Sequence, residues 1–175
     1  MVIPEPALVL LIGPSGAGKS TFAQAHFRPT EIVSSDAARQ MLTDDPGDQG
    51  ASAEAFHILS ILIKGRLKRR LTAVVDATNL RAIDRKRYCQ VAARYGIPTV
   101  AVAYDLPTRL YHAHNARRPD RVVDESVVAN QAARMAQALA DLPGEGYAAL
   151  YVIGVDQGIA EIEVVRSSLA LMLTS

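Results

Sequence analysis

Two groups of residues in this chain carry side chains that suit chemistry on a phosphate. The first is the run Gly13-Pro14-Ser15-Gly16-Ala17-Gly18-Lys19-Ser20, which has the G-x-x-x-x-G-K-S spacing of a phosphate-binding P-loop. Its glycines let successive backbone N–H groups curve around phosphate oxygens at the start of a helix. We therefore expect ATP to bind here. The expected nucleotide contacts within this run and just after it are Gly13, Ser15, Gly16, Ala17, Gly18, Lys19, Ser20 and Thr21.

The second group consists of charged residues that follow two apolar segments farther along the chain. Asp36 and Arg39 are three residues apart in an expected helix, so they point to one face. Asp76 follows another apolar run, where P-loop proteins place a second group directed at Mg²⁺, usually through water. The alternative is that Asp76 only caps a turn. Ser20 offers the hard oxygen that Mg²⁺ prefers, so we expect Ser20 and Asp76 to form the metal site.

Phosphoryl transfer needs a positioned donor, neutralised charge and a group that receives the acceptor's proton. Lys19 follows the γ-phosphate, Asp36 is the candidate general base, and Arg39 beside it is placed to orient the acceptor. A base away from the P-loop suits an acceptor hydroxyl better than a bound water. These three candidate catalytic residues therefore favour a kinase over an ATPase.

Strands and helices alternate along the chain, and this order places the two groups at one edge of a sheet. Expected strands cover residues 7–12, 31–34, 71–75, 99–104 and 147–153. Expected helices cover 20–26, 37–42 after a helix start at Ser34-Ser35-Asp36, 52–70, 81–95, 107–118 and 124–142. Such alternation implies an α/β protein of the P-loop NTPase, kinase-type fold, with a five-stranded parallel sheet and helices on both faces. The tail is ambiguous. Residues 161–165 alternate like an edge strand, and residues 166–173 suit a helix.

The last two expected helices form a hairpin, which we interpret as a lid at about residues 107–142. Its elbow contains Pro119-Asp120-Arg121, and Arg117 and Arg118 come just before. The planar guanidinium group suits phosphate oxygens, so we expect Arg118 and Arg121 to contact ATP. The alternative is a solvated basic corner.

Size and composition bound the function further. A chain of 175 residues suits one domain, residues 1–175, and its net charge of +1 argues against binding nucleic acid through broad electrostatics. A single cysteine, Cys89, leaves no internal disulfide and no cysteine metal cluster to propose. No apolar run approaches the roughly 18 residues of a membrane span, so we expect a cytoplasmic protein without a membrane partner.

A basic cluster at residues 64–70 allows two interpretations. Lys64, Arg66, Lys68, Arg69 and Arg70 lie at the end of a long expected helix, whose apolar positions are Phe56, Leu59, Ile63 and Leu67. Basic residues favour a helix C-terminus, which makes a solvated face the preferred interpretation. The alternative is a patch that binds nucleic acid.

The chain resembles a known family at these motifs. Besides the P-loop, the likeness is carried by residues 30–36 with Arg39, by the segment from Asp44 through Gln49 to Phe56, and by Asp76-Ala77-Thr78-Asn79. It continues in Asp84-Arg85-Lys86 and in Arg118-Pro119-Asp120-Arg121. In this order and spacing they resemble the 5′-hydroxyl polynucleotide kinase domain of bacterial nucleic-acid end-healing enzymes.

The resemblance implies that the 5′-OH end of RNA or DNA is the acceptor, that Asp36 is the base, and that Arg39 meets the phosphate or sugar beside the acceptor nucleoside. Larger members carry phosphatase and ligase modules that this chain lacks, so such activity is expected from a separate polypeptide. One departure is His114, which stands where a further lid arginine is expected.

Two other functions remain open on the sequence alone. One is a small-molecule kinase of the same fold, acting on a sugar, nucleoside or antibiotic hydroxyl. The other is a nucleotide-binding switch with little transfer activity. The sequence also leaves open the choice of RNA or DNA, of ATP or GTP, and the oligomeric state.

Overall fold

The computed structural model describes residues 1–117, 122–155 and 162–168. Its strands are β1 (Val2–Glu5), β2 (Leu8–Ile12), β3 (Ile32–Ser34), β4 (Ala73–Asp76), β5 (Thr99–Tyr104), β6 (Ala149–Ile153) and β7 (Val165–Ser168). Its helices are α1 (Lys19–His26), α2 (Ser35–Thr43), α3 (Ser52–Lys68), α4 (Ala82–Arg94), α5 (Thr108–Ala116) and α6 (Glu125–Asp141), with 3₁₀ turns η1 (Pro29–Glu31) and η2 (Leu142–Gly144).

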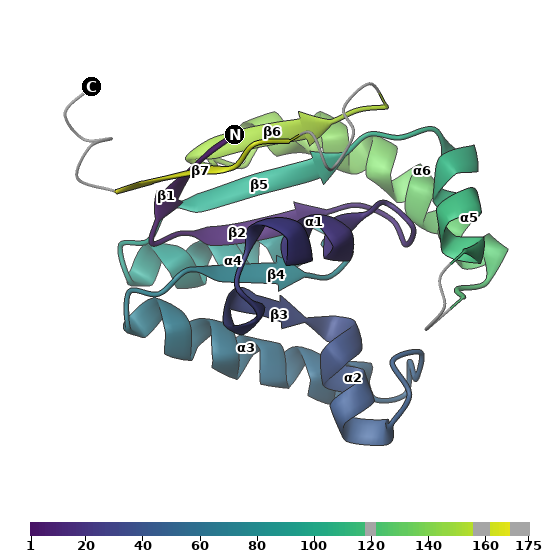
Figure 1. The fold of residues 1–175 in the computed structure, drawn as a ribbon, viewed down its shortest axis with the longest axis horizontal. Coiled ribbons are helices and arrows are strands. Elements are labelled where there is room, and N and C mark those ends of the chain that lie inside the picture. Colours follow the sequence, from purple (N-terminus) through teal and green to yellow (C-terminus); the bar gives the residue numbers. More distant parts are fainter. Residues whose placement is uncertain (118–121, 156–161, 169–175) are drawn as a thin grey trace.

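The centre of the molecule is a five-stranded sheet in the order β3-β4-β2-β5-β6, and all its pairings are parallel (Figure 1). β2 lies in the middle, and every one of its side chains is buried. Because successive side chains of a strand point to opposite faces, Leu8, Leu10 and Ile12 join one core cluster and Val9 and Leu11 join the other. The expected five-stranded parallel sheet is confirmed.

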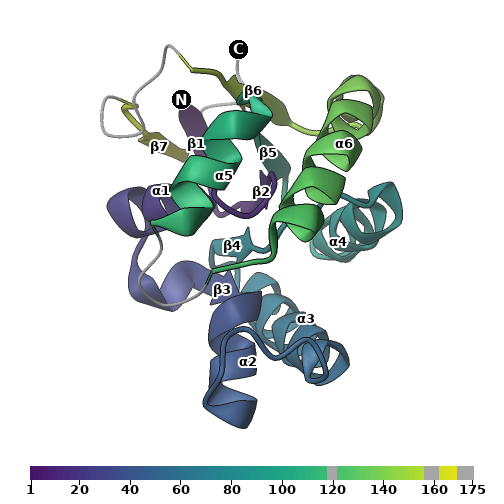
Figure 2. The same ribbon diagram turned by 90° about the vertical axis from the view of Figure 1, so that its right-hand side faces the viewer.

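Helices cover both faces of this sheet, as Figure 2 shows in a view toward the carboxyl ends of the strands. On one face the core is completed by α3, α4 and α6, through residues such as Leu59, Ala92 and Met135. On the other face it is completed by Phe22 of α1 and Tyr111 of α5. Among the described residues, no helix has both the length and the apolar character that a membrane span requires.

The helix α3 differs from the sequence expectation at one position. Leu59, Ile63 and Leu67 are buried, as their spacing predicts, and Ala55 is the fourth buried residue of the helix. Phe56 is instead 43 % exposed. The buried stripe runs through positions four apart, and Phe56 lies one residue outside it. Its ring therefore faces a pocket described below and not the core.

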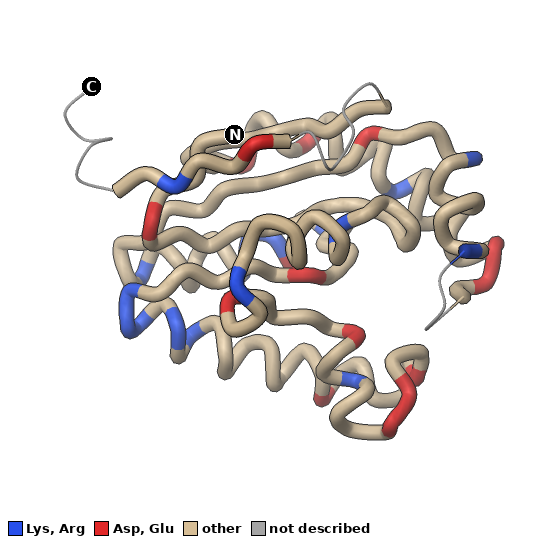
Figure 3. Tube along the Cα trace, in the orientation of Figure 1, with Lys and Arg blue, Asp and Glu red and all other residues tan. Residues whose placement is uncertain are grey.

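The basic end of α3 supports the preferred interpretation of the basic cluster. Arg66 donates from Nε to the carbonyl oxygen of Thr72 at 2.7 Å, and Arg69 donates from Nη1 to that of Gly65 at 2.9 Å. These arginines thus bind carbonyl groups around the helix C-terminus. Figure 3 shows this basic cluster at the turn from α3 to β4, at the opposite end of the sheet from the P-loop.

The N-terminus and the tail form a second, two-stranded sheet that the sequence did not predict. β1 pairs with β7 in parallel, so that Val2 lies opposite Val165 and Glu5 opposite Ser168. Residues 166–168 are therefore strand and not the start of the helix that suits residues 166–173. Residues 169–173 lie outside the described residues. Neither segment has a strong apolar pattern in its sequence. Each completes backbone hydrogen bonds by pairing with the other.

Candidate phosphate-binding and catalytic site

The P-loop joins the carboxyl end of β2 to the start of α1, as its motif predicts. Gly13 donates its backbone N–H to the carbonyl oxygen of Thr78 at 3.0 Å, which joins the loop to the segment after β4. Gly16 and Gly18 have φ angles of 80° and 91°, in the left-handed region that favours glycine. Gly18 also precedes the first residue of α1. The loop amides therefore surround the positive end of a helix, which suits an anion.

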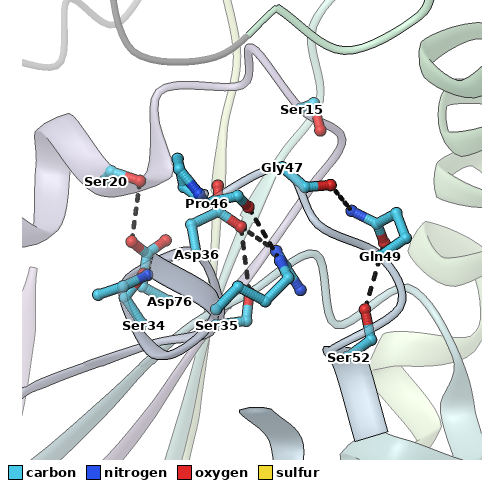
Figure 4. Close-up of polar contacts among 12 residues, drawn as sticks. Ser15, Ser20, Ser34, Ser35, Asp36, Pro46, Gly47, Gln49, Ser52 and Asp76 are labelled. Atoms are coloured by element: carbon cyan, nitrogen blue, oxygen red, sulfur yellow. Dashed lines mark hydrogen bonds and ion pairs between the residues drawn. The ribbon is translucent and has the colours of Figure 1, made fainter. Parts of the chain in front are cut away.

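The polar side chains that follow the loop lie where phosphate chemistry needs them. The Nζ of Lys19 donates to the carbonyl oxygen of Pro14 at 2.8 Å, so the lysine folds back over the loop. Ser20 donates from Oγ to Oδ2 of Asp76 at 2.8 Å (Figure 4). Asp76 is the last residue of β4, whereas the sequence predicted it as the first residue after the strand. Leu71, expected to begin that strand, is exposed and precedes it.

The hydroxyl of Ser20 and the carboxylate of Asp76 are a pair of hard oxygen atoms that fits Mg²⁺. This ion usually takes one or two protein ligands and completes its shell with water and substrate phosphates. No group of three or more His, Cys, Asp or Glu side chains within the described part of the chain could hold a metal ion. A site of two protein oxygens next to the P-loop therefore suits a metal that arrives with the nucleotide.

The second charged pair sits at the start of α2. Ser34 caps this helix by accepting from the N–H of Ala37, and Asp36 lies in its first turn. Arg39 donates from Nη2 to Oδ1 of Asp36 and from Nε to the carbonyl oxygen of Pro46 at 2.9 Å. Arg39 is only 5 % exposed. It therefore holds the carboxylate and the loop after α2 in fixed positions relative to each other.

One pocket brings both groups together. It is lined by Ser15, Lys19, Ser20, Ser35, Asp36, Arg39, Gln49, Ser52, Phe56, Asp76, Ala77, Thr78 and Gln131. A second hollow meets it at Ser20, Asp36 and Asp76 and extends between α1 and α2; its other walls are Gln24, Phe27, Pro29, Ile32, Ser34, Ala37, Gln40 and Pro46. Asp36 is thus reached from two sides.

The hairpin of α5 and α6 lies against the P-loop. A Cβ atom added to Gly16 would lie 2.2 Å from the carbonyl oxygen of Tyr111, so α5 approaches the loop as closely as a glycine allows. His114, the departure from the family pattern, has its Nδ1 3.0 Å from the carbonyl oxygen of Gly16. The predicted lid arginines Arg118 and Arg121 lie outside the described residues.

Sequence reasoning missed one residue of this site, Gln131 of α6. The backbone N–H of Ser15 donates to Oε1 of Gln131 at 2.8 Å. A glutamine inside a long helix is an ordinary exposed residue by its sequence alone. Only the packing of α6 against the loop brings it to a phosphate-binding amide.

The fold and the site together define this chain as an α/β protein with a P-loop kinase fold. Residues 8–141 match the family described as AAA domain, which covers most of the chain, so the protein belongs to that family. Among curated protein sequences, none matches this chain significantly.

Several solved structures share the fold. A gluconokinase from Sinorhizobium meliloti 1021 is 22% identical, with a TM-score of 0.58 over 91% of this chain and 89% of that one. The AvrRxo1-ORF1:-ORF2 structure with ATP is 16% identical, with a TM-score of 0.63 over 86% of this chain and 55% of that one. A chain of the Pnkp1/Rnl/Hen1 complex is 24% identical, with a TM-score of 0.51 over 61% of this chain and 38% of that one.

Proposed function

We propose that this protein is an ATP-dependent kinase that transfers the γ-phosphate of ATP to the 5′-hydroxyl end of a polynucleotide. The observation that carries the proposal is the position of Asp36. Its carboxylate is held by Arg39 and lines the same pocket as Lys19, Ser20 and Asp76. A positioned base facing the P-loop is what a hydroxyl acceptor requires.

The candidate catalytic and metal-binding residues each have a task in this reaction. The loop amides and Lys19 bind the phosphate oxygens of ATP and stabilise the charge that develops as ADP leaves. Ser20 and Asp76 would hold Mg²⁺, which would neutralise charge on the phosphate oxygens. Asp36 accepts the proton of the acceptor hydroxyl as that oxygen bonds to the γ-phosphorus. Arg118 and Arg121 contact ATP from the lid under this proposal.

The choice of a polynucleotide end rests on the resemblance of the acceptor-side residues. Arg39 and the segment from Asp48 through Gln49 to Phe56 match the pattern of the polynucleotide kinases, and Gln49, Ser52 and Phe56 all line the pocket beside Arg39. A chain of the Pnkp1/Rnl/Hen1 complex has a similar fold, which is compatible with this choice. Gripping only the terminal nucleotides is compatible with a net charge of +1.

A small-molecule kinase is the second candidate, and the hollow between α1 and α2 favours it. Its lining combines apolar side chains, the neutral polar side chains of Gln24, Ser34 and Gln40 and two carboxylates at the edge shared with the first pocket, and its described part includes no lysine or arginine. Such a surface suits an uncharged alcohol better than a phosphate backbone. The gluconokinase and the sugar kinase from Janibacter sp. HTCC2649 with this fold are in keeping with that alternative.

One transfer assay separates the two candidates. The protein is incubated with Mg²⁺ and ATP labelled on the γ-phosphate, and is offered either a 5′-OH oligonucleotide or a panel of sugars, nucleosides and aminoglycosides. We expect label on the oligonucleotide, and none with Lys19→Ala, which removes the P-loop cation. Label on a panel member alone would make the small-molecule kinase the correct assignment. Transfer by Lys19→Ala at the wild-type rate would contradict the P-loop assignment itself.

A further inference from the structure

The contact between α6 and the P-loop has a consequence for the nucleotide. The N–H of Ser15 is one of the loop amides that cradle phosphate in this motif, and Ser15 is 7% exposed. In the structure its N–H donates to Oε1 of Gln131. The carbonyl oxygen of a glutamine carries a partial negative charge, so Gln131 offers this amide the same kind of acceptor that a phosphate oxygen would offer.

The position of Ser15 along the loop indicates which phosphate competes with Gln131. The positive end of α1 begins at Lys19, after the N-cap residue Gly18, and attracts one phosphate group there. Ser15 lies toward the other end of the loop and lines the pocket that also contains Asp36. The phosphate that is transferred must lie between the helix end and Asp36. The amide of Ser15 is therefore on the side of the terminal phosphate.

Gln131 is placed by α6 and has little freedom to leave the site. Val128 and Met135 lie three residues before it and four residues after it, on the same face of the helix, and both are buried. Gln131 is thus a half-buried polar residue within the packed stripe of α6. Its amide group can still rotate, and it then presents an NH₂ donor in place of its oxygen.

We propose that Gln131 is a sensor of the terminal phosphate. Without a triphosphate its carbonyl oxygen accepts from Ser15 N–H. With ATP, the γ-phosphate takes that N–H, and the rotated amide of Gln131 donates to a phosphate oxygen. ADP leaves the original hydrogen bond in place. The lid helix α6 is thereby joined to the γ-phosphate of ATP and not to ADP. This inference rests on the nucleotide binding of the proposed function and is independent of the acceptor.

Nucleotide binding without an acceptor tests the inference. Dissociation constants for ADP and for an ATP analogue with a non-transferable γ-phosphate are measured with Mg²⁺ by calorimetry. Gln131→Ala should weaken the affinity for the triphosphate analogue by about tenfold. The hydrogen bond that this variant loses is made to a charged phosphate, and it is stronger than the neutral hydrogen bond that ATP displaces. ADP affinity should stay within about twofold.

Two further variants make the result specific. Gln131→Glu keeps the size of the side chain but has no donor and carries a negative charge. It should therefore weaken the affinity for the triphosphate analogue more than Gln131→Ala does. Gln137→Ala is the matched control, because Gln137 lies on the same helix and its side chain donates to Asp141 at an exposed site. It should bind both nucleotides as the wild type does.

A direct readout is the side-chain amide signal of Gln131 in ¹H–¹⁵N NMR spectra, which should move with the triphosphate analogue and not with ADP. Equal loss of ADP and triphosphate affinity in Gln131→Ala, or no loss of either, would overturn the sensor. So would a change confined to the KM of the acceptor. If wild-type protein binds neither nucleotide, the proposed function fails together with this inference.

Discussion

At the scale of single residues, the proposed transfer depends on the pair of Asp36 and Arg39. The two side chains are hydrogen bonded, and the arginine is buried while the carboxylate is half-buried. Their tasks differ. Asp36 is the proposed proton acceptor, whereas Arg39 both holds it and joins α2 to the carbonyl oxygen of Pro46. Separate substitutions can therefore separate chemistry from positioning.

Asp36→Asn should lower kcat by roughly 10² to 10⁴, the usual contribution of a positioned base, and should leave the affinity for ATP nearly unchanged. The amide keeps the volume of the carboxylate but does not accept a proton. Asp44→Asn is the matched control, because Asp44 is an exposed carboxylate at the end of the same helix. Steady-state kinetics of both variants check this. A normal rate in Asp36→Asn would mean that the base lies elsewhere.

Arg39→Ala should lower transfer to every acceptor, because Asp36 loses the group that positions it. The loss should be larger for an oligonucleotide than for a bare nucleoside, since a guanidinium bound to a phosphate makes a charge-assisted contact that the nucleoside never had. The ratio of kcat/KM for the two acceptors measures the difference. An equal loss for both would show that Arg39 positions Asp36 only, and would favour the small-molecule kinase.

At the scale of elements, the contact of α5 with the P-loop determines how closely the proposed lid approaches the loop. The contact depends on Gly16, whose φ angle is 80° and whose missing Cβ leaves room for the backbone of Tyr111. Asn115 belongs to the same contact, because its backbone N would lie 3.0 Å from that Cβ atom, and its side chain both donates to and accepts from the backbone of Val123. The end of α5 is therefore fixed both to the loop and to Val123.

Gly16→Ala should lower both the stability and the affinity for ATP, because the new methyl group collides with a carbonyl oxygen and the backbone is strained. A cost of about 1 to 3 kcal/mol is typical of a non-glycine residue held in a sparsely populated conformation. Gly144→Ala is the control, since nothing lies within 4 Å of its added Cβ. Thermal unfolding and nucleotide titration measure the two effects. Wild-type values for Gly16→Ala would show that α5 does not rest on the loop in solution.

At the scale of the whole molecule, one ion pair joins the end of the chain to the segment before the catalytic helix. Arg166 of β7 donates to both carboxylate oxygens of Glu31, at 2.9 and 2.6 Å, and also to Glu5 at 3.2 Å. Its guanidinium lies 5.1 Å from the ring centre of Phe27. Burial alone raises the pKa of Glu31, but hydrogen bonds from Arg166 and from the N–H of Arg28 outweigh it and lower the pKa.

Glu31→Gln should lower the free energy of unfolding at pH 7 by about 1 to 3 kcal/mol, because Arg166 loses the buried one of its two carboxylate partners. Glu5→Gln removes the exposed partner of the same arginine and should cost less than about 1 kcal/mol. Urea unfolding of the two variants provides the comparison. Similar costs for both variants would show that the ion pair of Arg166 with Glu31 stabilises the fold no more than the pair with Glu5 does.

The same ion pair predicts a dependence on pH. The pKa of Glu31 is lower in the folded state than in the unfolded state, so its contribution is present above the unfolded value of about 4.3 and is lost as the pH falls through the folded value. The gap in stability between the wild type and Glu31→Gln should therefore shrink below about pH 4.3. A gap that stays constant in acid would contradict the pairing.

The sequence by itself determined the parts of this protein that local spacing specifies. The P-loop, the helix start at Ser34, the strand Thr99–Tyr104 and the parallel direction of the main strands follow from periodicity and from residues next to each other in the chain. The convergence of Lys19, Asp36 and Asp76 on one pocket was also predictable. Each lies at or just after the carboxyl end of a parallel strand, and all such strands end at one edge of the sheet.

Only the tertiary structure decided the contacts between distant segments. Gln131 meets Ser15 across 116 positions, Arg166 meets Glu31 across 135, and β1 pairs with β7 from the two ends of the chain. Phe56 lines the pocket and not the core for the same kind of reason, since the face that a helix buries is set by the elements packed against it. For a single polar side chain or a short strand, the neighbouring residues in the sequence do not indicate which group it will contact. Its partner is chosen when the packed elements bring two groups together.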